Sequence, residues 1–477
     1  MRRRLARTAR VAATAAGRAA TGRGQATQAG ALGPVVEAFQ ELGATYVKLG
    51  QLIGSSPGIF GAAWSTAFRS VLDSGPALPP GAARAEVEAE LGRPVERLFE
   101  SFEDRPLAAA SIAVVHRARL PGGEPVAVKV LRPGIGPVVQ ADVAILGPLV
   151  RFLSRQGLEQ VAAVHSFLGG LRQQVAEELD LRNEAAAMAR FRELFADMGL
   201  DRIVVPAVHG SHSGRRVLTM ELLDGVAIDD PATVDWGGAD PRVLLLQLLK
   251  GWFTTAVVDG VFHGDLHAGN MLLLRDGRLG MIDWGILGRL DPATHWLFRR
   301  MLEACLGDTA GWRDVAEVYR VMGLSMQDDF GMPDDVAATI ARAQLEPILT
   351  RPFGRIDLNR LFVTSRDAAG AMRAANGAES PRERWERWRA ARRHGRRVVA
   401  ADLRESPFDR ANFMLGKQLL YVERFGKLYL PDVPLLHDRR FVRRLLASPG
   451  PPSPLTRGHG SSGPVRPGGG PGVPGPW

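Results

Sequence analysis

The spacing of hydrophobic and polar residues changes along the chain and predicts a small sheet set between helical regions. Residues 107–120 read as a strand, a loop and a second strand, and residues 125–133 alternate as a half-buried strand. Two further strands, at residues 203–208 and 216–221, are expected to close the same sheet. The pattern therefore predicts an α+β protein with its main sheet between residues 101 and 225.

Helical periodicity dominates the remaining segments. Helices are expected from near residue 34 to the break at Pro57-Gly58, and also at residues 82–91, 241–260, 292–322 and 335–446. The two ends are predicted to be disordered because they are rich in small residues, with arginine at the start and proline at the end. The predicted units are a basic tail (1–30), a helical extension (31–100), a sheet-containing lobe (101–225), a helical lobe (226–446) and a Gly/Pro-rich tail (447–477).

One segment, residues 261–285 (VFHGDLHAGNMLLLRDGRLGMIDWG), is expected to organise the rest of the chain. It reads as a loop followed by a β-hairpin with strands at 271–274 and 279–282. The Asp276-Gly277 pair between these strands is a strong hairpin signal. The loop and the end of the hairpin are therefore expected to lie close together.

Three oxygen-bearing side chains in this segment suit phosphoryl transfer. Asp265 can accept a hydroxyl proton or orient an attacking oxygen, while Asn270 and Asp283 can share a magnesium ion bound to nucleotide phosphates. Carboxylate and amide oxygens are the ligands that Mg²⁺ prefers. The alternative is a surface loop that merely turns the chain, but the spacing of the three residues across a hairpin favours a phosphotransferase-type ATP site.

Lys129 lies in the apolar strand VAVKV, where a kinase places the lysine that holds the α- and β-phosphates. A lysine in such a strand needs a carboxylate partner, since an unpaired buried charge is costly. Asp180 and Glu184 lie four residues apart on one face of the following helix, and Glu184 is the predicted partner. The alternative is a strand-edge lysine whose amine reaches water.

A hinge between the two lobes is predicted at residues 222–225, directly after the last strand of the sheet. Backbone groups there can pair with an adenine ring. Glu221 and Leu223 are therefore candidate nucleotide-binding residues.

Taken together, these motifs resemble the UbiB/AarF family of atypical protein-kinase-like proteins, which includes the mitochondrial coenzyme Q kinases. The resemblance covers residues 34 to 445, and its most specific marks are absent from ordinary kinases. The matching positions are the KxGQ motif (Lys48-Leu49-Gly50-Gln51), the alanine-rich loop (Ala108-Ala109-Ala110-Ser111), the ExD motif (Glu178-Leu179-Asp180), Glu184, and the catalytic-loop and metal residues Asp265, Asn270 and Asp283.

This resemblance implies a bilobal protein-kinase-like fold with an N-terminal helical extension laid across the cleft. In that arrangement Lys48, with Gln51 on the same helix, forms a plug that can pair with Glu178 or Asp180 and exclude a protein substrate. The implied ligands are ATP or ADP with Mg²⁺. The implied role is ATP binding and hydrolysis that supports the synthesis of prenylated quinones or other isoprenoid lipids, usually at a membrane.

The chain departs from the family pattern at several positions. Ala113-Val114 stand where the family usually has Gly-Gln, Leu266 and Ala268 stand where the catalytic loop usually has prolines, and Trp284 replaces phenylalanine. Alanine lacks the access of glycine to positive φ, so the alanine-rich loop is expected to wrap phosphates differently. The polar residues that would touch phosphate or metal are all retained.

Two other functions are compatible with the sequence. The HGDLHAGN loop also matches aminoglycoside- and choline-kinase-like phosphotransferases, although that class predicts neither the KxGQ nor the ExD motif. The other alternative is a non-catalytic module in which bound nucleotide switches a lipid- or protein-binding surface. Tight nucleotide binding without turnover would distinguish this module from an enzyme.

Amino-acid composition limits the possible binding partners and the location of the protein. The net charge is +9, but the 60 basic residues comprise five lysines and 55 arginines, a bias typical of genome composition, so no nucleic-acid partner is predicted. Cys305 is the only cysteine, which excludes an internal disulfide. The sequence contains no apolar run of 18 residues, so no membrane span is predicted. A cytoplasmic protein is expected, and any contact with the inner face of a membrane would be peripheral.

Trp385 and Trp388 lie among arginines in residues 381–397. This pattern can bind an anionic membrane surface. The favoured interpretation, however, is an amphipathic helix that packs on the helical lobe through its tryptophans.

Overall fold

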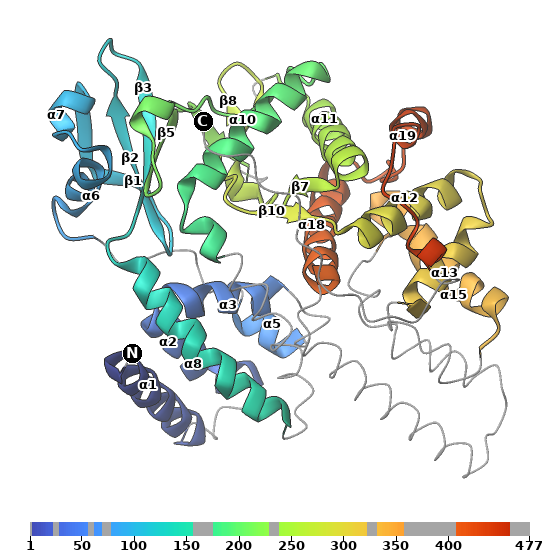
Figure 1. Cartoon of the computed structure of the whole chain (residues 1–477), viewed down its shortest axis with the longest axis horizontal. Helices are drawn as coiled ribbons and strands as arrows, with labels where there is room; N and C mark the ends of the chain where they lie inside the picture. The colour runs from blue at the N-terminus through green and yellow to red at the C-terminus, as the bar shows by residue number, and fades with distance from the viewer. Residues whose placement is uncertain are drawn as a thin grey trace.

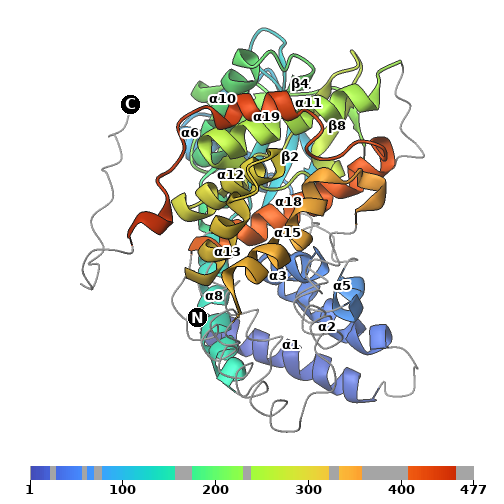
Figure 2. The same ribbon diagram turned by 90° about the vertical axis from the view of Figure 1, so that its right-hand side faces the viewer.

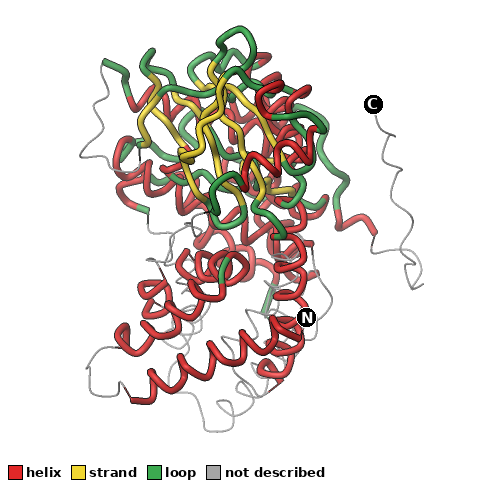
Figure 3. The backbone as a smooth tube through the Cα atoms, turned by 90° about the vertical axis from the view of Figure 1, so that its left-hand side faces the viewer, coloured by secondary structure: helices red, strands yellow, loops and turns green. Residues whose placement is uncertain are grey.

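The computed structural model describes residues 2–21, 28–55, 62–68, 78–155, 175–228, 238–321, 332–356 and 407–457. Within these ranges, a two-lobed body contains all the strands, and a group of helices lies below it (Figures 2 and 3). Residues 381–397, with their two tryptophans, lie outside the described residues.

The first lobe is built on a four-stranded antiparallel sheet in the order β1-β2-β3-β5. The strands are β1 (Ser101–Ala109), β2 (Ala113–Arg119), β3 (Pro125–Leu131) and β5 (Val217–Glu221). Alternate residues of a strand face opposite sides, and β3 follows this rule. Val126, Val128 and Val130 pack under α6 (Ala82–Leu91) and α7 (Val95–Leu98). Lys129 is therefore on the other face, toward α10 (Leu181–Asp197).

The boundaries of α6 agree with the sequence prediction because glycine flanks the helix at both ends. Gly81 and Gly92 have φ of 74° and 69°, and the N–H of Gly92 donates to the carbonyl of Glu88. This is the left-handed ending that glycine adopts at little cost.

The predicted strand at residues 203–208 does not join the first sheet. Only Ile203–Val204 (β4) is a strand, and it pairs in parallel with β9 (Leu279–Met281) of the second lobe. Val208 reaches β5 through a single bridge to Met220. Pro206 supplies the physical reason, since it has no N–H to donate to a sheet ladder.

The second lobe carries the predicted hairpin at its inner edge. Its strands β8 (Met271–Leu274) and β9 lie in a sheet of order β4-β9-β8-β6, with β6 at Gly225–Ala227, and β7 (Val261–His263) pairs separately with β10 (Leu287–Arg289). Gly277 has φ of 78°, as the Asp-Gly turn requires.

Helices surround these strands and share one large core with them (Figure 1). They are α11 (Pro241–Thr254) with a π-helical continuation (Thr255–Asp259), α12 (Pro292–Leu306), α13 (Gly311–Val321), α15 (Asp334–Thr350), α18 (Pro407–Tyr429) and α19 (Arg439–Leu446). Elements of the two lobes are also connected by three-residue 3₁₀ turns (Gly210–His212, Ala268–Asn270, Phe353–Arg355). As predicted, α11 begins at a proline. The side chain of Asp240 caps it by accepting the N–H of Arg242.

The helical extension has a hydrophobic core of its own. Its helices are α1 (Arg2–Thr21), α2 (Gln28–Leu42), α3 (Ala44–Ser55) and α5 (Ala62–Phe68), and α8 (Ile135–Arg155) joins them from the first lobe. Tyr46, Leu49 and Phe68 are among its buried residues. The extension therefore folds around its own apolar centre.

The prediction that residues 1–30 form a disordered tail is wrong for most of that segment. Residues 2–21 form α1, which buries Val11 and Ala15 against the extension core. The segment gave no clear apolar period because most of its buried face consists of small or long polar residues. Alanine and arginine are nevertheless good helix formers.

A buried ion pair fixes α1 to the rest of the extension. The guanidinium of Arg4 donates to Asp142 of α8 at 2.7 Å and to the carbonyl of Leu42. Thr45, at the start of α3, donates to the same carboxylate at 2.9 Å. Asp142 is 0% exposed, so three helices meet at one buried charge.

The predicted disordered C-terminal tail is also wrong for its first residues. Residues 447–457 are described and end in a 3₁₀ turn (Pro454–Arg457). Arg299 of α12 holds this segment by donating to the carbonyls of Leu446 and Ser448 at 2.7 Å each. Residues 458–477 lie outside the described residues. Among the helices that are described, none combines the length and the hydropathy needed to cross a membrane.

Candidate active site

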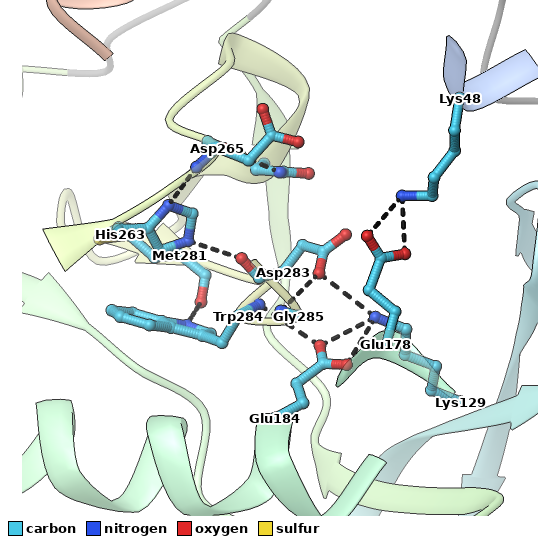
Figure 4. Close-up of polar contacts among 11 residues, drawn as sticks. Lys48, Lys129, Glu178, Glu184, His263, Asp265, Met281, Asp283, Trp284 and Gly285 are labelled. Atoms are coloured by element: carbon cyan, nitrogen blue, oxygen red, sulfur yellow. Dashed lines mark hydrogen bonds and ion pairs between the residues drawn. The ribbon is translucent and has the colours of Figure 1, made fainter. Parts of the chain in front are cut away.

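Lys129, Glu184 and Asp283 come together between the two lobes (Figure 4). The ammonium of Lys129 donates to both carboxylate oxygens of Glu184 at 2.8 Å and to Asp283 at 3.3 Å. The Lys129 and Glu184 side chains are 13% and 3% exposed, and Asp283 keeps 44% exposure. Lys129 thus has the partner expected from the sequence, and Asp283 presents a carboxylate to the open side.

The charges of this cluster are strongly coupled. Burial raises the pKa of Glu184 to about 7, although Lys129 pulls it down. Burial would lower the pKa of Lys129, but the carboxylates of Asp283 and Glu184 outweigh it and raise that pKa. For Asp283, burial is outweighed by Lys129 and the N–H of Gly285, which hold its pKa well below the usual range. The ammonium and the Asp283 carboxylate are therefore charged at neutral pH.

Trp284 anchors the segment that carries Asp283. Its indole N–H donates to the carbonyl of Met281 at 2.9 Å, and its backbone N–H donates to Glu184 at 3.3 Å. The ring packs 4.7 Å from that of Phe191 on α10. The replacement of phenylalanine by tryptophan is thus accommodated by one extra hydrogen bond inside the core.

His263 links the catalytic loop to the end of the hairpin. Its Nδ1 accepts the N–H of Asp265 at 3.1 Å, so Nε2 carries the proton and donates to the carbonyl of Asp283 at 2.6 Å. Burial lowers the pKa of His263, which keeps it in this neutral form. No role for His263 was predictable from its sequence position, and only the fold reveals both partners.

Asn270 is oriented by the loop itself. Its side-chain N–H donates to the carbonyl of Asp265 at 3.1 Å, which leaves the amide oxygen as the atom that can ligate a cation. No group of three His, Cys, Asp or Glu residues suited to a metal occurs among the described residues. An amide and a carboxylate alone are too few for a resident metal, but they fit Mg²⁺ that arrives with phosphate and water ligands.

Lys48 reaches this cluster from the extension. Its ammonium lies 2.6 Å from a carboxylate oxygen of Glu178, and both side chains are largely buried. A Cβ placed on Gly285 would lie 3.9 Å from Cγ of Glu178, so the pair adjoins the segment after Asp283 (Figure 4). Gln51 lies one turn further along α3 and is half-buried.

Asp180 is not part of the pair. It caps α10, and its carboxylate accepts the backbone N–H and the guanidinium of Arg182 at 3.2 and 2.6 Å. A capping side chain bends back over the first turn of its helix. It therefore does not share the face of Glu184, as simple four-residue spacing suggested.

The alanine-rich loop forms a tight turn at the end of β1. Ala108 and Ala109 are still paired with β2, and the N–H of Ala110 donates to the carbonyl of Ala113 at 2.9 Å. Arg132 donates to the carbonyl of Ala110 at 3.0 Å, and Ser111 is buried. The loop is thus held by its own backbone and by the guanidinium of Arg132.

The two candidate residues at the hinge face different ways. Glu221 exchanges bonds with Ala207, since its N–H donates to the carbonyl of Ala207 at 2.8 Å and its carboxylate accepts the N–H of Ala207 at 3.1 Å. The side chain of Leu223 packs against Gly280 of β9. The Glu221 carboxylate is therefore occupied by its hydrogen bond to Ala207. Leu223 lies against the strand that leads to Asp283.

Comparison with known proteins defines the class. The ABC1 atypical kinase-like domain matches residues 70–318, more than half of the chain. The chain therefore belongs to the ABC1 atypical kinase-like family. The predicted kinase-like α+β fold is confirmed.

Individual relatives extend the similarity beyond that domain. An uncharacterized protein of Mycobacterium tuberculosis is 35% identical over 404 residues, covering 84% of this chain and 75% of that protein. A chloroplastic aarF domain-containing protein kinase of Arabidopsis thaliana is 32% identical over 429 residues, covering 87% and 75%. A probable protein kinase UbiB of Marinobacter nauticus is 33% identical over 343 residues, covering 69% and 60%.

Proposed function

We propose that this protein binds ATP or ADP with Mg²⁺ and acts as a UbiB-type atypical kinase or ATPase. The observation that supports this most strongly is the cluster of Lys129, Glu184 and Asp283 beside the loop of Asp265 and Asn270. Phosphoryl transfer uses a buried lysine held by carboxylates, next to a loop that carries a catalytic carboxylate and an amide oxygen able to bind a metal ion.

Each residue has a proposed task. Lys129 holds the α- and β-phosphates while Glu184 orients its ammonium, and Asp265 accepts the hydroxyl proton or orients the attacking water. Asn270 and Asp283 hold the Mg²⁺, which would neutralise charge on the phosphates. The turn at residues 108–111 covers the phosphates, and the backbone at Glu221 and Leu223 pairs with adenine.

The extension has a proposed role in choosing the substrate. Lys48 and Glu178 close the edge of the site next to Gly285, which disfavours a folded protein as acceptor. A prenylated quinone precursor or another isoprenoid lipid fits the resemblance to the UbiB/AarF family. Its polar head is small enough to approach Asp265, and peripheral contact with a membrane would deliver it.

The test is phosphate release from Mg-ATP, measured with and without vesicles that contain anionic or isoprenoid lipids. We expect release by the native protein, and Asp265→Asn is expected to lower it by about 10²–10⁴-fold, the usual worth of a positioned acid or base. Nucleotide binding should survive that substitution because Asp265 lies beyond the phosphate-holding residues.

Two results would contradict the proposal. Normal hydrolysis by Asp265→Asn would remove Asp265 from its assigned role. Tight nucleotide binding without release, even with lipid present, would favour the nucleotide-switched module, whose plausibility rests on the plug of Lys48 across the site edge.

A further inference from the structure

The catalytic loop is tied from behind by a helix near the C-terminal end. Gln418 of α18 accepts the backbone N–H of Leu266 through Oε1 at 3.0 Å, one residue after Asp265. Gln418 is 0% exposed. Figure 1 shows α18 alongside β7 and β10, which frame this loop.

The neighbours of Gln418 on α18 also meet the loop. A Cβ on Gly264 would lie 2.6 Å from Cε of Met414, so the absent side chain lets the helix close on the backbone. The rings of His267 and Tyr421 lie 6.3 Å apart. Positions 414, 418 and 421 follow helical spacing, so one face of α18 covers the loop.

The amide of Gln418 is a costly residue to bury in this place. Its Nε2 has no hydrogen-bond partner within the described structure. The bond from Leu266 to Oε1 is therefore the one hydrogen bond there that offsets the cost of burying the amide. A hydrophobic side chain of similar size would pack at lower cost. General packing therefore does not explain the glutamine, whereas the need to hold the N–H of Leu266 does.

That N–H exists because residue 266 is leucine, since proline has none. The side chain of Leu266 is itself buried and lines a small apolar pocket with Trp252 of α11 and Phe425 of α18. The residue after Asp265 is thus fixed twice, by its side chain between two helices and by its backbone at Gln418.

We propose that Gln418 is a positioning residue for Asp265, holding the catalytic loop through the backbone N–H of Leu266. This inference rests on the proposed function of Asp265. Loss of the bond frees the backbone next to the catalytic carboxylate without touching Lys129, Glu184 or Asp283. Misplacement of a catalytic group by about 1 Å can cost about 10²-fold in rate.

The test compares Gln418→Met with Gln418→Glu. Methionine matches glutamine in length but offers no acceptor, so we expect kcat to fall by about 10- to 100-fold with the KM for Mg-ATP within about twofold of the native value. Glutamate keeps an acceptor oxygen in either protonation state and is expected to restore most of kcat.

Gln247→Met is the control for loss of a side-chain acceptor. Gln247 on α11 also accepts a backbone N–H, that of Arg202 at 3.3 Å, but the bond is exposed and lies outside the site. A role in stability alone predicts that Gln418→Met loses thermal stability and keeps kcat. We expect kcat to fall only for Gln418→Met.

A double-mutant cycle with Leu266→Pro isolates the bond. Gln418→Met should lower kcat in the native background and have no further effect in the Leu266→Pro background, because proline has no N–H to hold. Equal effects in both backgrounds would overturn the proposal. So would a kcat for Gln418→Met within twofold of the native value.

Hydrogen exchange separates this inference from the proposed function. Exchange in residues 261–270 is measured in the nucleotide-free protein, so it requires no turnover. If the native protein hydrolyses no ATP, faster exchange at Leu266 in Gln418→Met than in Gln247→Met still supports the positioning bond. Unchanged exchange at Leu266 would overturn it.

Discussion

At the scale of single residues, the Lys129 ammonium pairs with two carboxylates that differ in exposure. Glu184 is almost fully buried and locks Lys129 in place, while Asp283 is part-exposed and is only 3.3 Å from the same ammonium. Glu184 therefore holds the ammonium of Lys129 in position, and Asp283 is the carboxylate available to a ligand.

The raised pKa of Glu184 predicts a pH-dependent stability. Glu184 releases its proton near pH 4.5 in the unfolded chain and near pH 7 in the folded chain. Between these values the folded state holds more protons, so the contribution is full below pH 4.5 and is lost as pH rises to 7. Glutamine does not titrate and cancels this dependence.

The measurement is denaturant unfolding of the native protein and of Glu184→Gln at pH 5, 6 and 7, without nucleotide or metal. We expect the native free energy of unfolding, relative to Glu184→Gln, to fall by about 1 kcal/mol per pH unit between pH 5 and 7. A difference that stays flat with pH would show that Glu184 titrates at its ordinary value.

Residue-level contacts were predictable where periodicity fixes direction. The alternation of β3 placed Lys129 opposite the valines, and the helix after it offered Glu184 as a partner. Asp180 was misjudged because it caps its helix instead of lying within it. The bonds of His263 and Gln418 were out of reach, since each depends on backbone atoms up to 152 residues away.

At the scale of elements, α3 carries the contact that joins the extension to the site. Lys48→Ala removes that contact, and we expect the plug to loosen, with increased phosphate release or autophosphorylation. Lys427→Ala is the control, because Lys427 pairs with Glu423 within α18. Unchanged kinetics with unchanged nucleotide affinity would remove Lys48 from the site.

The buried charge on α8 is expected to hold α1 and α3 together. Asp142→Ala strands the Arg4 guanidinium and removes the acceptor of Thr45, so it should destabilise the extension by about 3 kcal/mol. Limited proteolysis measures this as earlier cleavage within residues 2–55. Glu37→Ala, which removes only the exposed pair with Arg18 between α1 and α2, should cleave like the native protein.

If the extension of Asp142→Ala resisted proteolysis as well as that of Glu37→Ala, this account of the buried charge would be contradicted. If Asp142→Ala instead shortened the lifetime of the whole chain, the extension and the two-lobed body would form one cooperative unit despite their separate cores.

Elements were predictable where local signals agree. Glycine at both ends defined α6, and Pro241 after Asp240 defined the start of α11. The predictions for two segments, residues 2–21 and residues 203–208, were wrong for opposite reasons. The arginine- and alanine-rich α1 lacked an apolar stripe but is held by tertiary contacts, and the apolar run at residues 203–208 was cut short at Pro206.

At the scale of the whole molecule, the core of the extension and the large core of the two-lobed body lie on either side of a cluster of charges. The extension and the two-lobed body each bury their own apolar residues, and the Lys48–Glu178 pair spans the boundary beside Asp283. Nucleotide that neutralises or engages Asp283 acts at this boundary. The position of the extension is therefore expected to respond to the ligand in the site.

The most direct test of the central claim is Mg²⁺-dependent stabilisation by nucleotide. A ligand that binds only the folded state stabilises it by about 2.7 kcal/mol at 100 times its Kd, so the Tm should rise with Mg-ATP and Mg-ADP. Asp283→Asn should lose the contribution of Mg²⁺, whereas Asp432→Asn, which alters an exposed ion pair with Arg242, should keep it. No rise in Tm at millimolar nucleotide, or the same Mg²⁺ dependence in Asp283→Asn, would contradict a Mg-nucleotide site at this cluster.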